Sequence, residues 1–341
     1  MASHGTCFRI GMRVRRIVTR KAATSSPTIA VVIPCYRETG HILDVLASIG
    51  SEVARIFVVD DACPDHTGNH VSAHCSDNRV SVITLTENSG VGGATIAGYR
   101  AAIEADTDII VKLDGDGQMD PAFIPKLIRP IVQGRADYAK GNRFYDLDNL
   151  SGMPKVRIVG NLGLSFASKM SSGYWDLFDP TNGYTAIHAK VAAKLPLDKI
   201  RRDFFFESDM LFRLGTIRAV VADVPMAAHY GSETSSLSTR RVLLPFAWNH
   251  YVNTGKRLFY SYFLRDFSAA SVELLVGKLM FLFGLIFGLW HWRLSVVTGI
   301  PATAGTVLLA ALPILLGSQL LIAFLNFDTR NQPHEPLHPY L

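Results

Sequence analysis

Cysteine is scarce in this chain, and its four residues, Cys7, Cys35, Cys63 and Cys75, form no CxxC pair. The spacing excludes the usual zinc-binding patterns and favours a thiol-reducing, cytosolic location for the main domain. Acidic residues are absent from the first thirty positions. An apolar run of about 7–15 residues is absent there too, so a secretory signal is not expected.

The acid-free N-terminal arm, residues 1–27, is strongly basic. Its charge suits an anionic membrane surface or a nucleic acid, a mitochondrial-type presequence is a further alternative, and a disordered tail fits the composition equally well. The rest of the chain is close to neutral, although the whole carries a formal net charge of +5. The six basic residues of the arm are Arg9, Arg13, Arg15, Arg16, Arg20 and Lys21.

The first half of the chain alternates predicted strands with predicted helices. Apolar, β-branched runs occupy 28–35, 55–59, 80–85 and 108–113, and helical periodicity occupies 38–49 and 92–105. This alternation predicts an α/β fold with a parallel, doubly wound sheet. Ligands bind such sheets beyond the carboxyl ends of the strands, where polar clusters lie at 36–38, 60–65 and 114–120.

Residues 111–121 read VKLDGDGQMDP and hold the most specific of these clusters. Asp114 and Asp116 form a DxD pair after a buried strand, and two carboxylates at this spacing can bind one Mg²⁺ or Mn²⁺ together with ligand phosphates. An EF-hand is excluded because no glutamate closes a twelve-residue loop. Asp120 and Pro121 are expected to start the next helix instead.

Other strand ends offer candidate ligand contacts. Asp60 and Asp61 can accept hydrogen bonds from a base or a ribose, or cap a helix. The glycine-rich segment 88–94 lacks the GxGxxG spacing of a dinucleotide site and is interpreted as a turn that opens a helix near phosphates. Glu207 and Asp209, beside three phenylalanines, are a general base or simply a helix start. A turn around Gly183, and the loop at His229 and Tyr230, are acceptor-side or lid elements, or plain loops.

Two apolar stretches, 267–290 and 303–327, are each long enough to cross a hydrocarbon core, which needs about 20 residues. The short link at 291–300 predicts a hairpin. Basic residues outside both ends favour a cytoplasmic position for those ends, despite Arg293 in the link. A buried, soluble helical hairpin is the alternative.

In order along the chain, VVIPCYRE, VVDDACPDHT, NSGVGGATIAGYRAA, DGDGQMDP, NGYTAIH and FFFESDM resemble family 2 glycosyltransferases of the GT-A fold. With the terminal hairpin, residues 28–330 are similar to the polyprenyl-phosphate glycosyltransferases, a group that includes dolichol-phosphate mannose synthases. The resemblance implies a GT-A domain at 28–240, a juxtamembrane amphipathic segment at 241–266, a transmembrane hairpin at 267–327 and a tail at 328–341.

The resemblance also implies roles for individual residues. Arg143, Glu207, Asp209 and Asp116 would be catalytic, Arg201 and Arg202 would meet a lipid phosphate, and Gln118 would join the metal site of Asp114 and Asp116. The expected nucleotide-sugar contacts are Pro34, Tyr36, Glu38, Asp60, Asp61, Asp114 and Gln118.

The implied activity is metal-dependent, inverting transfer of a sugar from a UDP- or GDP-linked donor to a polyprenyl phosphate at the cytoplasmic membrane face. A sugar hydroxyl of a glycolipid or cell-envelope glycan is the alternative acceptor, and an inactive nucleotide-sugar-binding scaffold is a second alternative. A processive polysaccharide synthase is not favoured, because the chain has no QxxRW motif. No nucleic acid is expected as a partner, and a homo-oligomer is left open.

Overall fold

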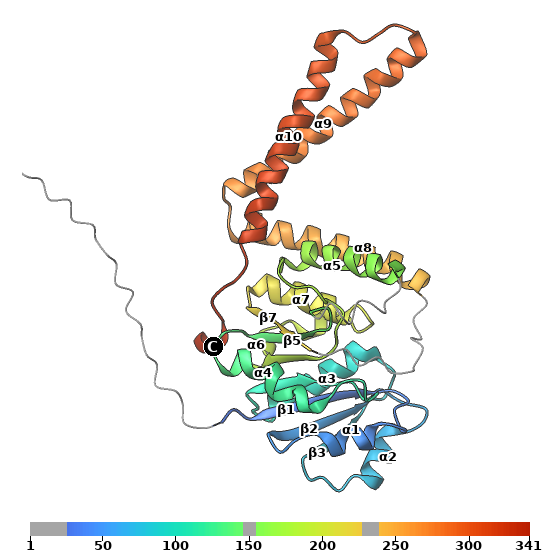
Figure 1. The fold of residues 1–341 in the computed structure, drawn as a ribbon, viewed down its shortest axis with the longest axis vertical. Coiled ribbons are helices and arrows are strands. Elements are labelled where there is room, and N and C mark those ends of the chain that lie inside the picture. The colour runs from blue at the N-terminus through green and yellow to red at the C-terminus, as the bar shows by residue number, and fades with distance from the viewer. Residues whose placement is uncertain (1–25, 146–154, 227–238) are drawn as a thin grey trace, which may run out of the picture.

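The computed structural model describes residues 26–145, 155–226 and 239–341. An α/β domain lies at one end, and a long helical hairpin projects from it (Figure 1). The basic arm, apart from residues 26 and 27, and the loop at His229 and Tyr230 lie outside the described residues.

The domain is built on a seven-stranded sheet in the order β3-β2-β1-β4-β6-β5-β7. The four strands expected from the sequence are confirmed and pair in parallel, and they form one half of the sheet. β6 runs antiparallel to both of its neighbours, β4 and β5, so the sheet is mixed rather than wholly parallel. The strands are β1 (Ile29–Cys35), β2 (Val53–Asp60), β3 (Val80–Thr84), β4 (Ile109–Lys112), β5 (Tyr138–Asn142), β6 (Thr185–His188) and β7 (Val221–Pro225).

Helices cover both faces of the sheet, because its central strands are apolar on both sides. In β1, Ala30 and Val32 join the core cluster under α3 and α7, whereas Val31 and Ile33 join the cluster under α1 and α4. The helices of the domain are α1 (Ile42–Ser48), α2 (Thr67–His74), α3 (Gly90–Glu104), α4 (Ile124–Val132), α5 (Lys155–Ser172), α6 (Ala189–Ala192) and α7 (Phe206–Ile217), with short 3₁₀ turns η1 (Pro121–Phe123) and η3 (Leu197–Lys199).

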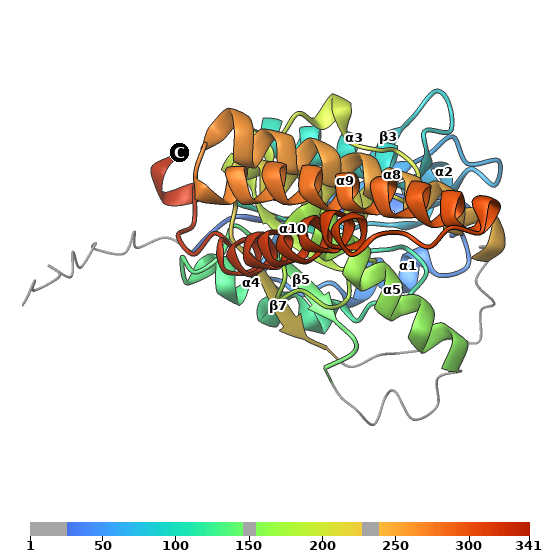
Figure 2. The ribbon, with the colours of Figure 1, turned by 90° about the horizontal axis from the view of Figure 1, so that it is seen from above.

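A second layer separates the sheet from the hairpin. It consists of α5 and of α8 (Thr239–Phe259), which continues into the π-helical η4 (Tyr260–Arg265). Figure 1 shows these helices between the domain and the hairpin, and Figure 2 shows α9 and α10 overlying them from above. Apolar side chains on this layer face outward, among them Phe166 (57% exposed) and Trp248 (64% exposed). The layer therefore carries exposed aromatic side chains, and the juxtamembrane amphipathic role of 241–266 stays a prediction.

The hairpin consists of α9 (Ala269–Thr298) and α10 (Ala304–Arg330), both long and apolar enough to cross a membrane. Glycines let the two backbones approach, because a Cβ on Gly284 would lie 2.7 Å from the Ala310 carbonyl oxygen. The link predicted at 291–300 is wrong in extent. α9 continues to Thr298 because residues 291–298 contain neither glycine nor proline, and Gly299 ends the helix in a left-handed conformation with φ +69°.

A buried carboxylate fastens the hairpin to the domain. Asp328, at the end of α10, accepts both arms of a bidentate pair from Arg257 of α8, at 2.7 and 2.9 Å. Tyr262 and Trp175 donate to the same carboxylate at 2.6 and 3.0 Å. The tail then returns to the sheet, where Asp137 accepts from the backbone and the ring of His338 near η5 (His338–Tyr340).

Candidate active site

The carboxyl ends of β1, β2 and β4 meet at one edge of the sheet. Cys35 pairs with Asp60 in the β1–β2 ladder, and the Asp61 amide donates to the Cys35 carbonyl at 3.1 Å. The DxD turn packs on the end of β1. A Cβ added to Gly115 would lie only 3.4 Å from Glu38 Cγ, which shows how close the two segments are. The polar clusters of these strands are therefore adjacent. Pro34 and Glu38 are half-buried in this region, and Tyr36 is 43% exposed.

Lys112 lies beneath the DxD turn and joins two carboxylates. Its ammonium is 2.6 Å from Asp114 Oδ1 and 3.4 Å from Glu207 Oε1. Burial alone would lower the pKa of Lys112, but the two adjacent carboxylates raise it above its ordinary value. Burial raises the pKa of Glu207, and Lys112 opposes that shift. Lys112 is thus a fixed positive charge that brings β4 and the start of α7 into one site.

Asp114 and Asp116 keep accessible carboxylates on the turn. The Asp114 side chain is 31% exposed, and its Oδ2 faces Gly183, where a Cβ would approach that oxygen to 2.9 Å. Asp116 Oδ1 accepts from the Gln118 backbone amide at 2.9 Å, while the Gln118 residue itself is exposed. Asp120 accepts from the Ala122 amide and starts η1 with Pro121 at its first position, as expected.

These two carboxylates fit a divalent cation that arrives with its ligand. Among the described residues, no group of three or more His, Cys, Asp or Glu side chains could hold a metal by itself. Mg²⁺ commonly uses one or two carboxylates, waters and substrate phosphates. Gly183 is required beside Asp114 Oδ2, because a Cβ there would lie 2.9 Å from that oxygen and 2.7 Å from the Lys112 ammonium, so the carboxylate oxygen is not covered by a side chain from residue 183.

Asp60 and Asp61 differ in the contacts they make. Asp60 is buried, and its two oxygens accept from the Cys63 and Gly68 amides at 2.7 and 2.6 Å, which positions the start of α2. Asp61 Oδ1 accepts from the Ser89 amide at 2.6 Å, next to the N-terminus of α3. Burial raises the pKa of Asp61. Asp60 is committed to its own loop, and a contact of either residue with a nucleotide stays a prediction.

The glycine-rich segment starts α3, as interpreted from the sequence, and its glycines contact another loop. The Gly92 amide donates to the Arg202 carbonyl at 2.9 Å. A Cβ on Gly90 would be 2.5 Å from the same carbonyl oxygen, and Gly90 has φ +77°. The structure therefore places the backbone of 201–202 on the start of α3. The Arg201 side chain pairs with Asp203, and Arg202 is exposed.

Glu207 and Asp209 lie in the first turn of α7, yet they point to different neighbours. Glu207 faces Lys112 in the DxD region. Asp209 is 2% exposed and accepts from the Arg201 amide at 3.0 Å and from Asn253 of α8 at 2.9 Å. Asp209 therefore joins α7 to α8 and to the 201–202 loop. Only Glu207 of this pair reaches the DxD region.

Arg143 is bound to a buried carboxylate after β5. Its guanidinium donates to Asp179 at 2.8 and 3.0 Å, and Asp179 is 1% exposed. Lys140 lies nearby with its ammonium buried and without a hydrogen-bond partner among the described residues. Burial lowers the pKa of Lys140 although Asp179 and Asp223 oppose the shift. Arg143 is 32% exposed, so part of its guanidinium surface is accessible.

Comparison with known proteins places this site in a family. Residues 30–195 match the model described as glycosyl transferase family 2. The chain is 31% identical over 233 residues to a UDP-N-acetylglucosamine–dolichyl-phosphate N-acetylglucosaminyltransferase of Methanococcus voltae, covering 64% of this chain and 92% of that relative. It is 30% identical to the undecaprenyl-phosphate mannosyltransferase of Micrococcus luteus, covering 58% of this chain and 82% of that relative. The chain belongs to glycosyl transferase family 2.

The fold of this family 2 glycosyltransferase also matches solved structures. Glucosyl-3-phosphoglycerate synthase from Mycobacterium tuberculosis, crystallised with phosphoglyceric acid, aligns with a TM-score of 0.51 at 19% identity, covering 68% of this chain and 80% of that chain. The same enzyme crystallised with Mn²⁺ and UDP aligns with a TM-score of 0.50. These matches confirm the GT-A fold expected from the sequence.

Three residues of the glycosyltransferase site were missed from the sequence. Lys112 and Lys140 are the charged residues inside otherwise apolar or small-residue strands, and that placement was the available signal, because a buried lysine needs a carboxylate partner. Asp179 was noted only as part of a turn, although it holds Arg143. No sequence pattern pairs residues 143 and 179.

Proposed function

We propose that this glycosyltransferase moves a sugar from a UDP- or GDP-linked donor to the phosphate of a polyprenyl lipid at the cytoplasmic face of a membrane. The observation that carries the proposal is the attachment of a DxD-bearing GT-A domain to an apolar hairpin through the buried Arg257–Asp328 pair. The two relatives are named for transfer to dolichyl phosphate and undecaprenyl phosphate, which supports the same acceptor class.

The apolar helices support a membrane location more than a soluble hairpin. Leu279 and Leu315 are 60% and 65% exposed, and large apolar side chains cover both helices. Such a contiguous apolar surface needs a membrane or a partner to cover it. The exposed aromatic residues of α5 and α8 lie where the hairpin meets the domain, so they fit the interfacial region of a bilayer.

Donor binding is assigned to the edge shared by β1, β2 and β4. Pro34, Tyr36, Glu38 and Asp61 would surround the nucleoside, and the DxD turn would meet its diphosphate. Asp114 and Asp116 would hold Mg²⁺ or Mn²⁺, which supplies a Lewis acid for the charge that develops on the leaving diphosphate. Lys112 orients Asp114, because its ammonium donates to Oδ1 and leaves Oδ2 on the side of Gly183.

The acceptor decides whether a base is required. A lipid monophosphate is largely ionised at neutral pH, since the second pKa of a phosphate ester is about 6. Its oxygen can attack the anomeric carbon directly, with inversion, and cations such as Arg143 would orient it. Asp209 is 2% exposed, and each of its oxygens accepts a hydrogen bond, one from the Arg201 amide and one from Asn253, so we assign it a positioning role rather than proton transfer.

A sugar hydroxyl is the second candidate acceptor, and one observation on Glu207 supports it. Glu207 lies at the site with its pKa raised by burial, which suits a general base. A hydroxyl acceptor would make the Glu207 carboxylate indispensable for proton removal. With a phosphate acceptor, Glu207 would contribute only its negative charge beside Lys112.

The test is radiolabelled transfer by the full chain in detergent or bilayers, with a panel of UDP- and GDP-sugars and with Mn²⁺, Mg²⁺ or EDTA. Label should enter a lipid extract only when polyprenyl phosphate is supplied, and EDTA should abolish the transfer. Transfer to polyprenol-linked sugars but not to polyprenyl phosphate would show that the acceptor is a sugar hydroxyl and not the lipid phosphate. Nucleotide-sugar binding by calorimetry without turnover on either lipid would refute the proposal.

A further inference from the structure

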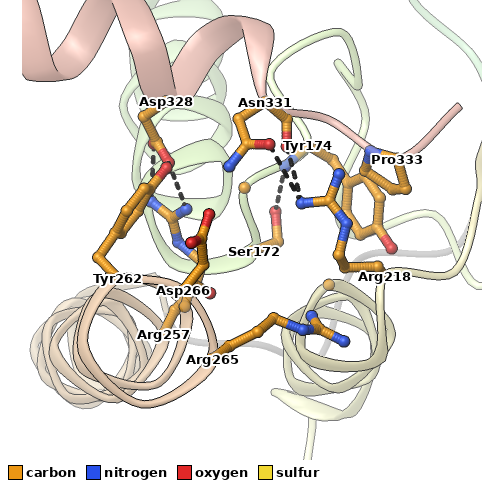
Figure 3. A pocket seen from close by; sticks show the side chains of 13 residues that line it. Ser172, Tyr174, Arg218, Arg257, Tyr262, Arg265, Asp266, Asp328, Asn331 and Pro333 are labelled. Atoms are coloured by element: carbon orange, nitrogen blue, oxygen red, sulfur yellow. Dashed lines mark hydrogen bonds and ion pairs between the residues drawn. The ribbon is translucent and has the colours of Figure 1, made fainter. Parts of the chain in front are cut away.

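A polar pocket of about 300 Å³ lies where the hairpin joins the domain. Its walls come from the ends of α5, α7 and α10 and from η4 (Figure 3). Glu207 near the start of α7 and Arg218 at its C-cap are eleven positions apart, so about 16 Å of helix lies between this pocket and the DxD site. The pocket is thus distinct from the sugar-transfer site.

The charges of the pocket are only partly paired internally. Arg257 and Asp328 neutralise each other in the bidentate pair. Arg218 donates to the carbonyl and side-chain oxygens of Asn331, and Arg265 donates to the Thr216 carbonyl. In the described part of the chain neither arginine has a carboxylate partner within ion-pair distance. Each guanidinium therefore keeps donors beyond those contacts, since it carries five N–H groups.

Asp266 supplies an opposite charge on another wall. It is exposed, lines the pocket, and makes no ion pair with any described residue. Figure 3 shows Arg218 and Arg265 together on one side, and Asp266 nearer to the Arg257–Asp328 pair. The pocket thus presents two cations and one anion as separate groups around one space.

The position of the pocket along the hairpin indicates where a ligand of complementary charge would come from. Arg265 and Asp266 lie four and three residues before the start of α9 at Ala269, and Asn331 immediately follows α10, so these residues lie at the domain end of both apolar helices. In a spanning hairpin this is the level of lipid headgroups. A zwitterionic headgroup with a primary ammonium places a phosphate and a hydrogen-bond-donating cation two carbons apart.

We propose that this pocket binds the headgroup of an aminophospholipid such as phosphatidylethanolamine, with the phosphate on Arg218 and Arg265 and the ammonium on Asp266. The inference rests on the membrane location proposed above, but it does not depend on the acceptor or the sugar. Guanidinium groups bind phosphate through charge-assisted hydrogen bonds. A choline headgroup cannot donate to Asp266, so the pocket should discriminate between two lipids of equal charge.

Native mass spectrometry of the delipidated full chain tests the proposal, with ethanolamine and choline phospholipids of identical acyl chains and with inorganic phosphate as probes. The wild type should bind the ethanolamine lipid more tightly than the choline lipid, and inorganic phosphate should not compete at millimolar concentration. Asp266→Asn should reduce ethanolamine binding to the choline level. Arg218→Gln with Arg265→Gln should weaken binding of both lipids by about tenfold or more, as expected for lost hydrogen bonds between charged groups.

Arg330→Gln is the matched control, because Arg330 is exposed at the same end of α10 but does not line the pocket. It should bind like the wild type. Asp266 makes no hydrogen bond or ion pair with another described residue, so Asp266→Asn should fold and decides the outcome if the double arginine variant does not fold. Equal binding of the two lipids by the wild type, or displacement of lipid by phosphate alone, would overturn the proposal. Either result would leave the sugar-transfer assay unaffected.

Discussion

At the residue scale, two carboxylates one helical half-turn apart have separate tasks. Glu207 faces Lys112 at the DxD turn, whereas Asp209 ties α7 to Asn253 and to the Arg201 amide. Glu207→Gln should lower kcat by about 10²-fold or more, since it removes a charge from the site, while the melting temperature changes little. Asp209→Asn should instead destabilise the fold by about 1–3 kcal/mol, because the amide cannot accept from both partners equally well.

The measurement pairs turnover with thermal unfolding for both variants. The inverse pattern, with Asp209→Asn inactive at wild-type stability, would return the base role to Asp209. A pH profile separates the acceptors further. With a hydroxyl acceptor, activity of the wild type should fall as pH drops through the raised pKa of Glu207, because the protonated acid cannot accept a proton.

The DxD turn carries the metal prediction. Asp116→Ala should reduce sugar transfer by about 10²-fold or more without preventing folding or membrane insertion, because Asp116 is partly exposed and packs no core. Asp120→Ala is the matched control on the same turn, where the carboxylate caps η1, and it should cost about 1 kcal/mol of stability while activity persists. Full activity of Asp116→Ala across a Mn²⁺ titration would remove the metal assignment.

Asp114, Asp116 and Glu207 could be predicted from the sequence, whereas Lys112, which joins Asp114 to Glu207, could not. Asp114 and Asp116 follow a buried strand, and that context makes a DxD informative. Lys112 sits inside the same strand, and only the tertiary structure shows that it turns toward Glu207, 95 positions later. Pairings between distant segments, such as Arg143 with Asp179, leave no periodic signal in either segment.

At the element scale, the helices and strands with a regular apolar period could be predicted from the sequence, whereas short strands and irregular connections could not. The strands β1 to β4 and helix α3 follow from β-branched runs and helical spacing. β6 has only four residues, and nothing in such a short run indicates that it inserts antiparallel between β4 and β5. The extent of α9 was underestimated because His291 and Arg293 suggested a turn, although both are compatible with the end of a helix near a membrane surface.

The junction between α8 and α10 should be the strongest single link between domain and hairpin. Asp328→Asn leaves the buried Arg257 without an ionised partner and should destabilise the protein by about 3–5 kcal/mol. Replacing both partners by apolar residues, Arg257→Met with Asp328→Leu, should recover much of that loss. Thermal unfolding in detergent measures both variants. Additive losses in the double variant would show that the two residues are not coupled.

At the scale of the whole molecule, the position of the charges relative to the hairpin predicts its orientation. Lys256, Arg265 and Arg330 lie outside the two ends of the hairpin, and Arg293 lies near its tip. The excess of basic residues at the domain end favours retention of that end in the cytoplasm. The link at 299–303 would then cross to the opposite side.

Cysteine labelling in intact cells tests this orientation, in a chain whose four native cysteines are replaced by alanine. Ala302→Cys, at an exposed position in the link, should react with a membrane-impermeant maleimide in intact cells. His334→Cys, exposed in the tail, should react only after permeabilisation. The opposite pattern would place the catalytic domain outside, and protection of both positions until permeabilisation would mean that the hairpin does not cross. Because Asp137 and Asp328 anchor the tail and α10 to the catalytic domain, the side on which His334→Cys reacts is also the side of the DxD site.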